Sequence, residues 1–290
     1  MSSKTGKIAF QGEYGANSDM ACRDVYPDME PVPCRTFEDV FNMVISGMAS
    51  LAMIPIENTI AGRVADIHLL LPDSNLYIVG EYFMPIHFQL MVIPGTPVEQ
   101  IKSVHSHIHA LGQCRNIIRE RGWHGIIAGD TAGAAKEIAA QQDMSKAALA
   151  PSLAAQLYGL EIIEHNIEDT DFNVTRFVVL SPKPVEINRD GSDEPVITTF
   201  VFNVRNLPAS LYKAMGGFAT NNVNMTKLES YQLGGKFTAT QFYADIEGHP
   251  DDPNVKRALE ELHYFSTKVR ILGSYRAHPF RSRSIVDVIK

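Results

Sequence analysis

The segment Asn173 to Phe177, "NVTRF", places an amide, a hydroxyl and a guanidinium at the mouth of an apolar run that ends at Leu180. If this run is a strand, alternate side chains share a face, so Asn173 and Thr175 look into the same pocket and Arg176 takes the opposite face. A hydroxyl and an amide that face one pocket can orient a polar ligand. The same sequence is also compatible with an edge strand that has no ligand, in which threonine is present for its strand propensity and the arginine is solvated.

A motif of strand, small polar turn and helix occurs four times before residue 142. It reads "IAFQGEYGANSDMA", "AMIPIENTIAGRV", "SVHSHIHALGQC" and "IIAGDTAGAAKEIAA". In an open α/β sheet the ends of such strands and the starts of such helices meet at one edge, where free helix N–H groups attract anions. The four turns therefore predict a cleft with anion-binding donors, although each polar turn residue could serve only as a helix cap.

Length and charge limit the possible functions. A chain of 290 residues that is 45% hydrophobic is long enough for two domains with separate cores. The net charge of −7, with no basic run beyond the short cluster 281–283, argues against a nucleic-acid partner. No signal-peptide core and no apolar stretch of the roughly 18 residues that a membrane helix needs are visible, so we expect a cytoplasmic protein with no membrane partner.

Cysteines and histidines give no convincing metal site. The cysteines lie far apart without a CxxC pair, and we interpret them as small buried residues: Cys22, Cys34 and Cys114. Three histidines alternate in "VHSHIHAL", at positions 105, 107 and 109, but no cysteine or carboxylate stands beside them. We therefore expect neither a disulfide framework nor a bound metal.

From residue 8 to about residue 180, short β-rich runs alternate with helical periods, which is the pattern of an α/β domain. The clearest helix is "TFEDVFNMVISG", because Thr36 and a carboxylate three residues later form a cap and Gly47 ends the apolar period. Strands are expected at 7–10, 51–56, 78–94, 102–105, 125–128, 147–150, 161–164 and 176–180.

Residues Ser181 to Pro195, "SPKPVEINRDGSDEP", are rich in proline and charge and lack apolar periodicity, so we interpret them as a linker. The order beyond them is βαββαβ, which is ferredoxin-like. Its strands are expected at 196–203, 223–231, 236–246 and 268–275, its helices at 209–220 and 253–265, and a turn at 233–235. A second domain therefore begins near Pro195.

The first 180 residues resemble the prephenate dehydratase family, whose motifs they match in order. The matches are the "IAFQGPxGS" turn at 8–16, "PIENS" at 55–59, "GE…LPIHH" at 80–87, "YSHPQALAQC" at 105–114, "STAxAA" at 130–135, "LYGL" at 157–160 and "NxTRF" at 173–177. The residues after the linker resemble the ACT regulatory module that follows this catalytic domain. There "NLPASLYKAMGGFATNNVNMTKLES", "FYADIEGH" and "LGSY" carry the match.

The resemblance implies a two-lobed catalytic domain, like a type II periplasmic binding protein, with the substrate in the cleft. It would cover residues 1–182, with lobe 1 at about 1–82 and 165–182 and lobe 2 at about 83–164. A linker at 183–195, an ACT domain at 196–278 and a tail at 279–290 complete the expected organisation. Assembly as a homodimer or homotetramer through the ACT domains is implied as well.

The implied reaction is the decarboxylating dehydration of prephenate to phenylpyruvate in phenylalanine biosynthesis. Because the ring takes up the electrons as it becomes aromatic, no cofactor or metal is required. The family assigns the leaving hydroxyl to Thr175, which we expect to orient that group and relay a proton, while Glu57 is either the acid or a helix cap. The implied substrate-binding residues are Asn17, Asn58, Ser106, Thr131, Asn173, Arg176 and Phe177. Arg176 could instead form a structural ion pair.

Phenylalanine is the implied allosteric effector, held where two ACT domains meet. The matching residues are Asn206, Leu207, Pro208, Ala209, Ser210, Leu211, Glu229 and Ser230. The sequence departs from the family at both motifs. The family's Gly-Ala-Leu is Ala209-Ser210-Leu211, and its Arg-Pro is Tyr231-Gln232, which puts effector affinity in question.

The catalytic half also departs from the family at three turns. The Ser-Tyr-Ser after the first glycine reads Ala16-Asn17-Ser18, and the proline of "SHP" is Ile108. The serine of the "STA" turn is Asp130. An acid in a turn that should bind anions is the least expected of these changes.

Two other functions fit the sequence. Arogenate dehydratase has the same fold and acts on the transaminated side chain; a chain without a transit peptide favours prephenate. A non-catalytic two-lobed sensor of amino acids or carboxylates would use the same cleft. The lack of a signal peptide and the presence of "NVTRF" count against that sensor.

Overall fold

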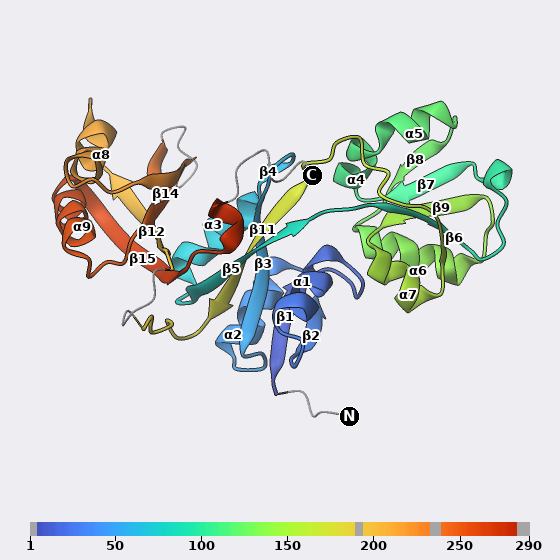
Figure 1. Ribbon diagram of the computed structural model, residues 1–290, viewed down its shortest axis with the longest axis horizontal. Coiled ribbons are helices and arrows are strands. Elements are labelled where there is room, and N and C mark those ends of the chain that lie inside the picture. The colour runs from blue at the N-terminus through green and yellow to red at the C-terminus, as the bar shows by residue number, and fades with distance from the viewer. Residues whose placement is uncertain (1–4, 189–193, 233–238, 283–290) are drawn as a thin grey trace. The chain divides into compact units, whose positions relative to one another are not determined.

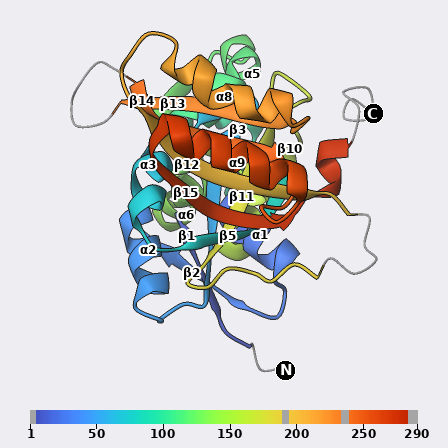
Figure 2. The same cartoon turned by 90° about the vertical axis from the view of Figure 1, so that its left-hand side faces the viewer.

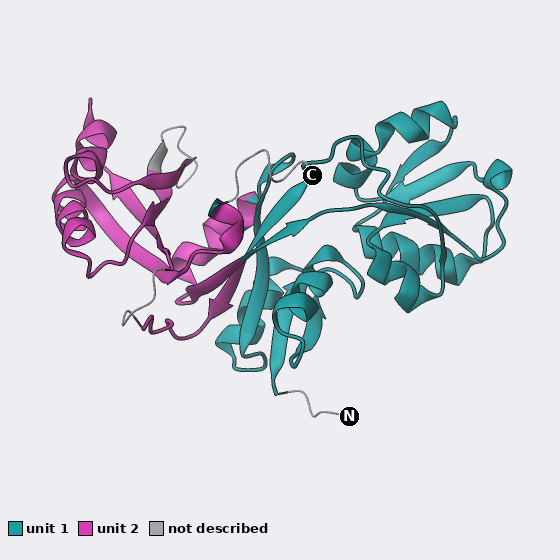
Figure 3. Cartoon of the chain, in the orientation of Figure 1, with its two compact units in different colours: residues 1–64, 82–177, 282–290 teal, residues 65–81, 178–281 magenta. Residues whose placement is uncertain are grey.

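The computed structural model describes residues 5–188, 194–232 and 239–282, so the predicted turn at 233–235 and the tail beyond residue 282 lie outside the described residues. The described residues form three sheets flanked by helices (Figure 1). They group into two compact units (Figure 3), one of residues 5–64, 82–177 and 282 and the other of residues 65–81, 178–188, 194–232 and 239–281. The domain boundaries given above were taken from the family motifs, and they stay a prediction.

The first sheet has the order β2-β1-β3-β11-β5, with the short β4 paired to β3. Strand β1 runs parallel to both of its neighbours, β2 and β3. The strands are β1 (Lys7–Gln11), β2 (Glu30–Cys34), β3 (Leu51–Asn58), β4 (Gly62–Arg63), β5 (Tyr77–Pro85) and β11 (Val174–Ser181). Helices α1 (Asn17–Val25) and α2 (Phe37–Ile45) follow β1 and β2.

The predicted cap of α2 is present as a capping box. The Thr36 hydroxyl accepts from the Asp39 backbone N–H at 3.1 Å, and the Asp39 carboxylate accepts from the Thr36 N–H at 3.3 Å. Strand β2 was not predicted, because "EPVPC" contains two prolines that cannot donate to a ladder. Its edge position, with β1 as its neighbour in the sheet, allows them.

The second sheet has the order β10-β6-β9-β7-β8. Its strands are β6 (Gln89–Val92), β7 (Ser103–Ser106), β8 (His124–Ile127), β9 (Lys146–Ala150) and β10 (Glu161–Glu164). Helices α4 (Ile108–Gln113), α5 (Arg115–Glu120), α6 (Thr131–Gln141) and α7 (Ser152–Tyr158) join them. The prediction of a single strand at 78–94 is wrong, because this range holds two strands, β5 and β6. The ladder is interrupted between them, where the Ile86 N–H donates to Asn173 O at 2.8 Å and the Phe88 N–H donates to the Glu168 carboxylate at 3.0 Å.

The third sheet confirms the ferredoxin-like order. It runs β13-β14-β12-β15, from the elements β12 (Val196–Val204), α8 (Ser210–Thr220), β13 (Met225–Gln232), β14 (Ala239–Glu247), α9 (Pro253–Phe265) and β15 (Ser266–Arg276). Both helices cover one face (Figure 2), where an apolar core gathers around Phe200, Phe202 and Phe242. A sheet with one face against helices has a second face that needs its own partner.

The other face of this sheet is buried although it is polar and aromatic. It packs against residues 65–81, which hold α3 (Ala65–Leu70) and η1 (Leu71–Asp73). The His68 ring stacks on Tyr231 at 4.7 Å and meets Tyr243 edge-on at 4.9 Å. Gly273 of β15 lies so close to this segment that a Cβ on it would sit 2.0 Å from the Ile78 carbonyl oxygen. Only glycine fits there.

A buried ion cluster fixes the same face. Glu81 and Asp245 have fully buried side chains, and Arg281 contacts them both, Glu81 through two bonds of 2.6 and 2.9 Å and Asp245 through one of 3.3 Å. Arg281 belongs to the turn η3 (Pro279–Ser282). The start of the predicted tail is thus built into the fold. In the described ranges no helix is long and apolar enough to cross a membrane.

Candidate functional site

Thr175 belongs to a hydrogen-bonded cluster at the junction of β3 and β11. Asn58, the last residue of β3, donates through its amide to Asn173 Oδ1 at 2.8 Å and to Thr175 Oγ1 at 3.0 Å. Thr175 is only 9% exposed and Asn173 only 3%. The bond from Asn58 uses a lone pair of the threonine oxygen and leaves its hydrogen for another acceptor. The predicted shared face of Asn173 and Thr175 is therefore present.

Gln113 extends this cluster and was not among the predicted site residues. Its side-chain oxygen accepts from the Asn173 amide, and its backbone oxygen accepts from the Asp169 N–H at 2.6 Å. Gln113 is the last residue of α4, so it ties the second sheet's helix to the segment that leads into β11. The only sequence signal for it is its place in the motif at 105–114.

Glu57 and Arg176 form an ion pair beside the cluster. Arg176 Nη1 lies 2.9 Å from Glu57 Oε1, with the arginine 3% and the glutamate 30% exposed. The alternative in which Glu57 caps a following helix is wrong. Glu57 is in β3 and pairs with Arg63 of β4, because Asn58 Oδ1 accepts from the Ile60 and Ala61 N–H groups and turns the chain back.

The remaining predicted residues lie elsewhere in the same compact unit. Ser106 is fully buried at the end of β7, where its hydroxyl donates to Leu149 O at 2.6 Å. Asn17 and Thr131 are the first residues of α1 and α6. Phe177 is 1% exposed within β11. The structure thus brings together Asn58, Asn173 and Thr175 by direct bonds, keeps Phe177 on the same strand as Thr175, and places Asn17, Ser106 and Thr131 on other elements.

The chain's own carboxylates occupy two of the four predicted anion-binding turns. The fully buried Asp19 accepts from the Gly15 N–H at 2.8 Å and pairs with Arg23. Asp130 caps α6 by accepting from the Gly133 N–H at 2.6 Å. These donors are therefore not free for a substrate carboxylate, which corrects the expectation that all four turns offer them. The turn after β3 leads to β4 instead of a helix.

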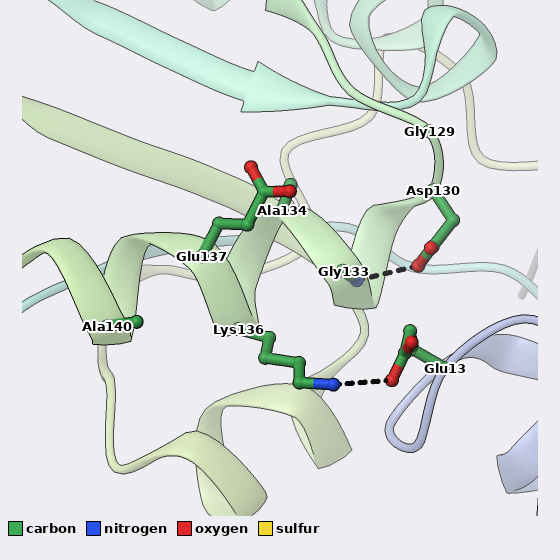
Figure 4. Close-up of a pocket in the computed structure, with 8 residues that line it drawn as sticks. All are labelled: Glu13, Gly129, Asp130, Gly133, Ala134, Lys136, Glu137 and Ala140. Atoms are coloured by element: carbon green, nitrogen blue, oxygen red, sulfur yellow. Dashed lines mark hydrogen bonds and ion pairs between the residues drawn. The ribbon is translucent and has the colours of Figure 1, made fainter.

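A cavity of about 360 Å³ lies beside the Asp130 cap (Figure 4). Its lining includes three carboxylates and one ammonium, from Glu13, Asp130, Glu137 and Lys136. Lys136 bonds to Glu13 at 2.9 Å, and this bond raises the pKa of the lysine above its usual value. The cavity is therefore acidic on balance.

The predicted effector residues lie on two elements of the third sheet's domain. Residues 206–211 lead into α8, where Ala209 adopts a left-handed conformation with φ of 62°. Glu229 is on the edge strand β13, and both of its oxygens are engaged, by Lys227 at 2.5 Å and by the Tyr231 hydroxyl at 2.7 Å. Burial raises the pKa of Glu229, but these two bonds outweigh it and leave the pKa lowered.

The titratable side chains outside the cluster offer no thiolate. Burial raises the pKa of the thiols of Cys22, Cys34 and Cys114. Burial also lowers the pKa of His105 and of His107, which favours the neutral rings. Among the described residues, no group of three or more His, Cys, Asp or Glu side chains is arranged to hold a metal ion.

Comparisons with known proteins agree on the family. Residues 8–185 match the family described as prephenate dehydratase. A bifunctional N-acyl-homoserine lactone acylase/prephenate dehydratase of Komagataeibacter europaeus is 47% identical over 276 residues, covering 95% of this chain and 98% of the relative. Arogenate dehydratase 2 of Petunia hybrida is 37% identical over 283 residues, covering 93% of this chain and 71% of the relative.

A solved structure is similar over nearly the whole chain. It is the prephenate dehydratase of Arthrobacter aurescens in complex with L-Phe, with a TM-score of 0.85, 30% identity, and coverage of 96% of this chain and 92% of that one. The likeness therefore includes the ferredoxin-like domain as well as the two lobes. The chain belongs to the prephenate dehydratase family.

Proposed function

We propose that this protein catalyses the decarboxylating dehydration of prephenate to phenylpyruvate, and that residues 1–182 are its catalytic domain, 183–195 a linker, 196–278 an ACT domain and 279–290 a tail. The observation that carries the proposal is the Asn58, Asn173 and Thr175 cluster at the family's "NxTRF" motif. Loss of carbon dioxide and hydroxide together makes the ring aromatic. The protein's task is then to bind the anionic substrate and to assist the departing hydroxide.

In this proposal Thr175 assists the departing group. Its oxygen accepts from Asn58 at 3.0 Å, so its hydrogen is directed to the leaving hydroxyl, and the hydroxide leaves as water after receiving a relayed proton. Asn173, Asn58 and Gln113 hold this hydroxyl in position. Glu57 lies one residue before Asn58 and is 30% exposed, and it supplies this proton from its protonated form; in its ionised form it pairs with Arg176. Asn17 and Thr131, the first residues of α1 and α6, would bind the substrate's carboxylates, whereas the predicted Ser106 is buried and its hydroxyl already donates to Leu149 O.

A direct assay tests the proposal. Purified protein mixed with prephenate should produce phenylpyruvate, detected by its ultraviolet absorbance, and a parallel reaction with arogenate reports the substrate preference. A Glu57→Gln variant should lose the acidic limb of the pH–rate profile if Glu57 supplies the proton. Absence of product from both substrates would refute the dehydratase assignment.

We also propose that phenylalanine regulates this activity through the ACT domain and that the domain pairs with a second copy of the chain. The relative from Arthrobacter aurescens was solved in complex with L-Phe, and the predicted effector residues Ala209 and Glu229 of this chain lie in its ferredoxin-like domain. Phenylalanine should inhibit turnover, and the mass in solution should be that of a dimer or tetramer. If phenylalanine neither inhibits turnover nor changes the thermal stability of the protein, the domain does not have this role.

A second activity, hydrolysis of N-acyl homoserine lactones at the amide bond, is favoured by the 47% identity to the bifunctional relative over 98% of its length. His87 and Glu168 supply the groups for it, because Nδ1 of the half-exposed imidazole lies 2.6 Å from a buried carboxylate oxygen. Such a carboxylate orients an imidazole as a general base that activates water. Release of homoserine lactone by the protein, and its loss in His87→Gln with dehydration retained, would support it; no release would refute it.

A further inference from the structure

Strand β13 carries the predicted effector residue Glu229, and its two faces lie in different environments, one towards the helices and one towards α3. Its neighbour β14 alternates in the same way: Phe242 and Ala244 face the helix-covered core, whereas Tyr243 and Asp245 belong to the opposite, polar face. Residues two apart on a strand share a face. Glu229 and Tyr231 therefore lie together on the face that packs against α3, as the contact of Tyr231 with His68 also requires.

Both the hydroxyl and the ring of Tyr231 contact neighbouring side chains. Its hydroxyl donates to Glu229 Oε2 at 2.7 Å, and its ring stacks on His68 with 4.7 Å between centroids and an interplanar angle of 25°. The tyrosine is 7% exposed and the histidine 2%. Close packing of two buried rings leaves no room for one to move without the other. A change in the position of Glu229 is thereby passed to His68.

His68 lies in α3, and α3 follows directly on the turn that bears the catalytic candidates. The helix begins at Ala65, two residues after β4 ends at Arg63. Strand β4 in turn pairs with Glu57 and Asn58 at the end of β3. The covalent chain thus connects the ring stack to the amide that bonds to Thr175, because His68 follows Asn58 by ten positions.

We propose that Tyr231 is the regulatory link of this protein: phenylalanine bound at Glu229 acts on Asn58 and Thr175 through the Tyr231–His68 stack and α3. The inference rests on the proposed regulation by phenylalanine. Tyr231 stands where the family pattern has arginine, so the link belongs to this chain's own sequence. Tyr231 touches no reacting atom and is a positioning residue for the regulation.

The test separates binding of the effector from its effect. In Tyr231→Leu the ring stack and the bond to Glu229 are both lost, while in Tyr231→Phe only the bond is lost. Each variant is compared with the wild type by calorimetric titration with phenylalanine and by kcat/KM for prephenate with and without saturating phenylalanine. Tyr264→Leu is the matched control, because Tyr264 is 84% exposed on α9.

The ratio of kcat/KM without and with phenylalanine measures the coupling, which is typically about 5-fold to 150-fold. We expect Tyr231→Leu to bind phenylalanine within about fivefold of the wild-type affinity but to reduce this ratio to less than about twofold, with Tyr231→Phe between the two. Basal kcat/KM should stay within about twofold in both, and Tyr264→Leu should behave as wild type.

The outcomes are distinguishable. Full inhibition of Tyr231→Leu by bound phenylalanine would overturn the link, as would equal loss of coupling in the Tyr264→Leu control. If phenylalanine does not bind the wild type, the proposed regulation and this inference fail together, while dehydration of prephenate stands. If Tyr231→Leu does not fold, the folded Tyr231→Phe decides: unchanged coupling in it overturns the bond to Glu229 as part of the link.

Discussion

The Thr175 hydroxyl is the group on which the proposed chemistry depends most directly. It is 9% exposed, and Asn58 fixes its oxygen at 3.0 Å. Thr175→Ala removes a placed donor that acts on the departing hydroxide, and such donors contribute roughly 10²–10³ in rate. We expect kcat to fall by about this factor with KM little changed.

Thr175→Ser is the control, because it restores the hydroxyl at nearly the same place. Steady-state kinetics of phenylpyruvate formation should therefore show partial recovery in the serine variant. Near-normal turnover by the alanine variant would remove Thr175 from the mechanism.

The three thiols give a second prediction at this scale. Burial raises the pKa of Cys22 and Cys114, and both side chains are fully buried, whereas Cys34 is partly exposed. The raised values mean that the folded state holds these protons more tightly. Their contribution to stability is therefore complete below the unfolded pKa of about 8.5 and is lost as the pH rises towards the folded values.

A thiol titration with an aromatic disulfide checks this. At pH 8 only Cys34 should react in the folded protein, and all three thiols should react in denaturant. Rapid reaction of a second thiol in the folded protein would contradict the burial argument.

At the scale of elements, the start of α8 carries local strain. Ala209 has φ of 62°, and a left-handed conformation costs a residue with a Cβ roughly 1–2 kcal/mol. Glycine avoids this cost, but its greater conformational entropy in the unfolded chain offsets part of the gain in stability. Ala209→Gly should therefore raise the free energy of unfolding by about 0.5–1 kcal/mol.

Urea denaturation measures the difference. Ala219→Gly, at an exposed position of α8, is the matched control and should destabilise by about 1 kcal/mol, since glycine is a poor helix former. Loss of stability in Ala209→Gly would show that the left-handed turn is not strained.

Regular periodicity allowed most elements to be predicted, and long-range contacts explain the rest. The capping box of α2 and the βαββαβ order depend on neighbouring residues, and both were predicted. Strand β2 depends on its edge position, and the break between β5 and β6 depends on Asn173 and Glu168, 80 or more residues away. Neither dependence leaves a local signal.

The same distinction holds for the candidate site. The alternation in "NVTRF" gave the shared face of Asn173 and Thr175, because strand geometry is local. It could not give Gln113, whose role depends on α4 meeting the segment before β11. The anion-binding turns were predicted without Asp19 as an occupant because a carboxylate four residues beyond Gly15 has no fixed direction until α1 forms.

At the scale of the whole molecule, Arg281 joins Glu81 of β5 to Asp245 of β14. Both carboxylates have fully buried side chains, so replacement of Arg281 removes the guanidinium that balances their charge in this cluster. Breaking a buried pair in this way costs about 3–5 kcal/mol. Arg281→Met should lower the free energy of unfolding by at least the smaller figure.

Differential scanning calorimetry can follow this loss together with any separation of the two compact units into distinct transitions. The exposed Arg205→Met variant removes the same charge and should change stability by less than about 0.5 kcal/mol. A similar small change in Arg281→Met would mean that the cluster does not hold the face together.

Gly273 determines how stiff the contact between β15 and residue Ile78 is. With 2.0 Å between an imagined Cβ and the carbonyl oxygen, main chain meets main chain there and no side chain cushions the contact. Side chains can absorb a displacement by changing rotamer, whereas peptide planes cannot. At this point, therefore, β15 cannot move closer to Ile78 without distorting the main chain of one of them.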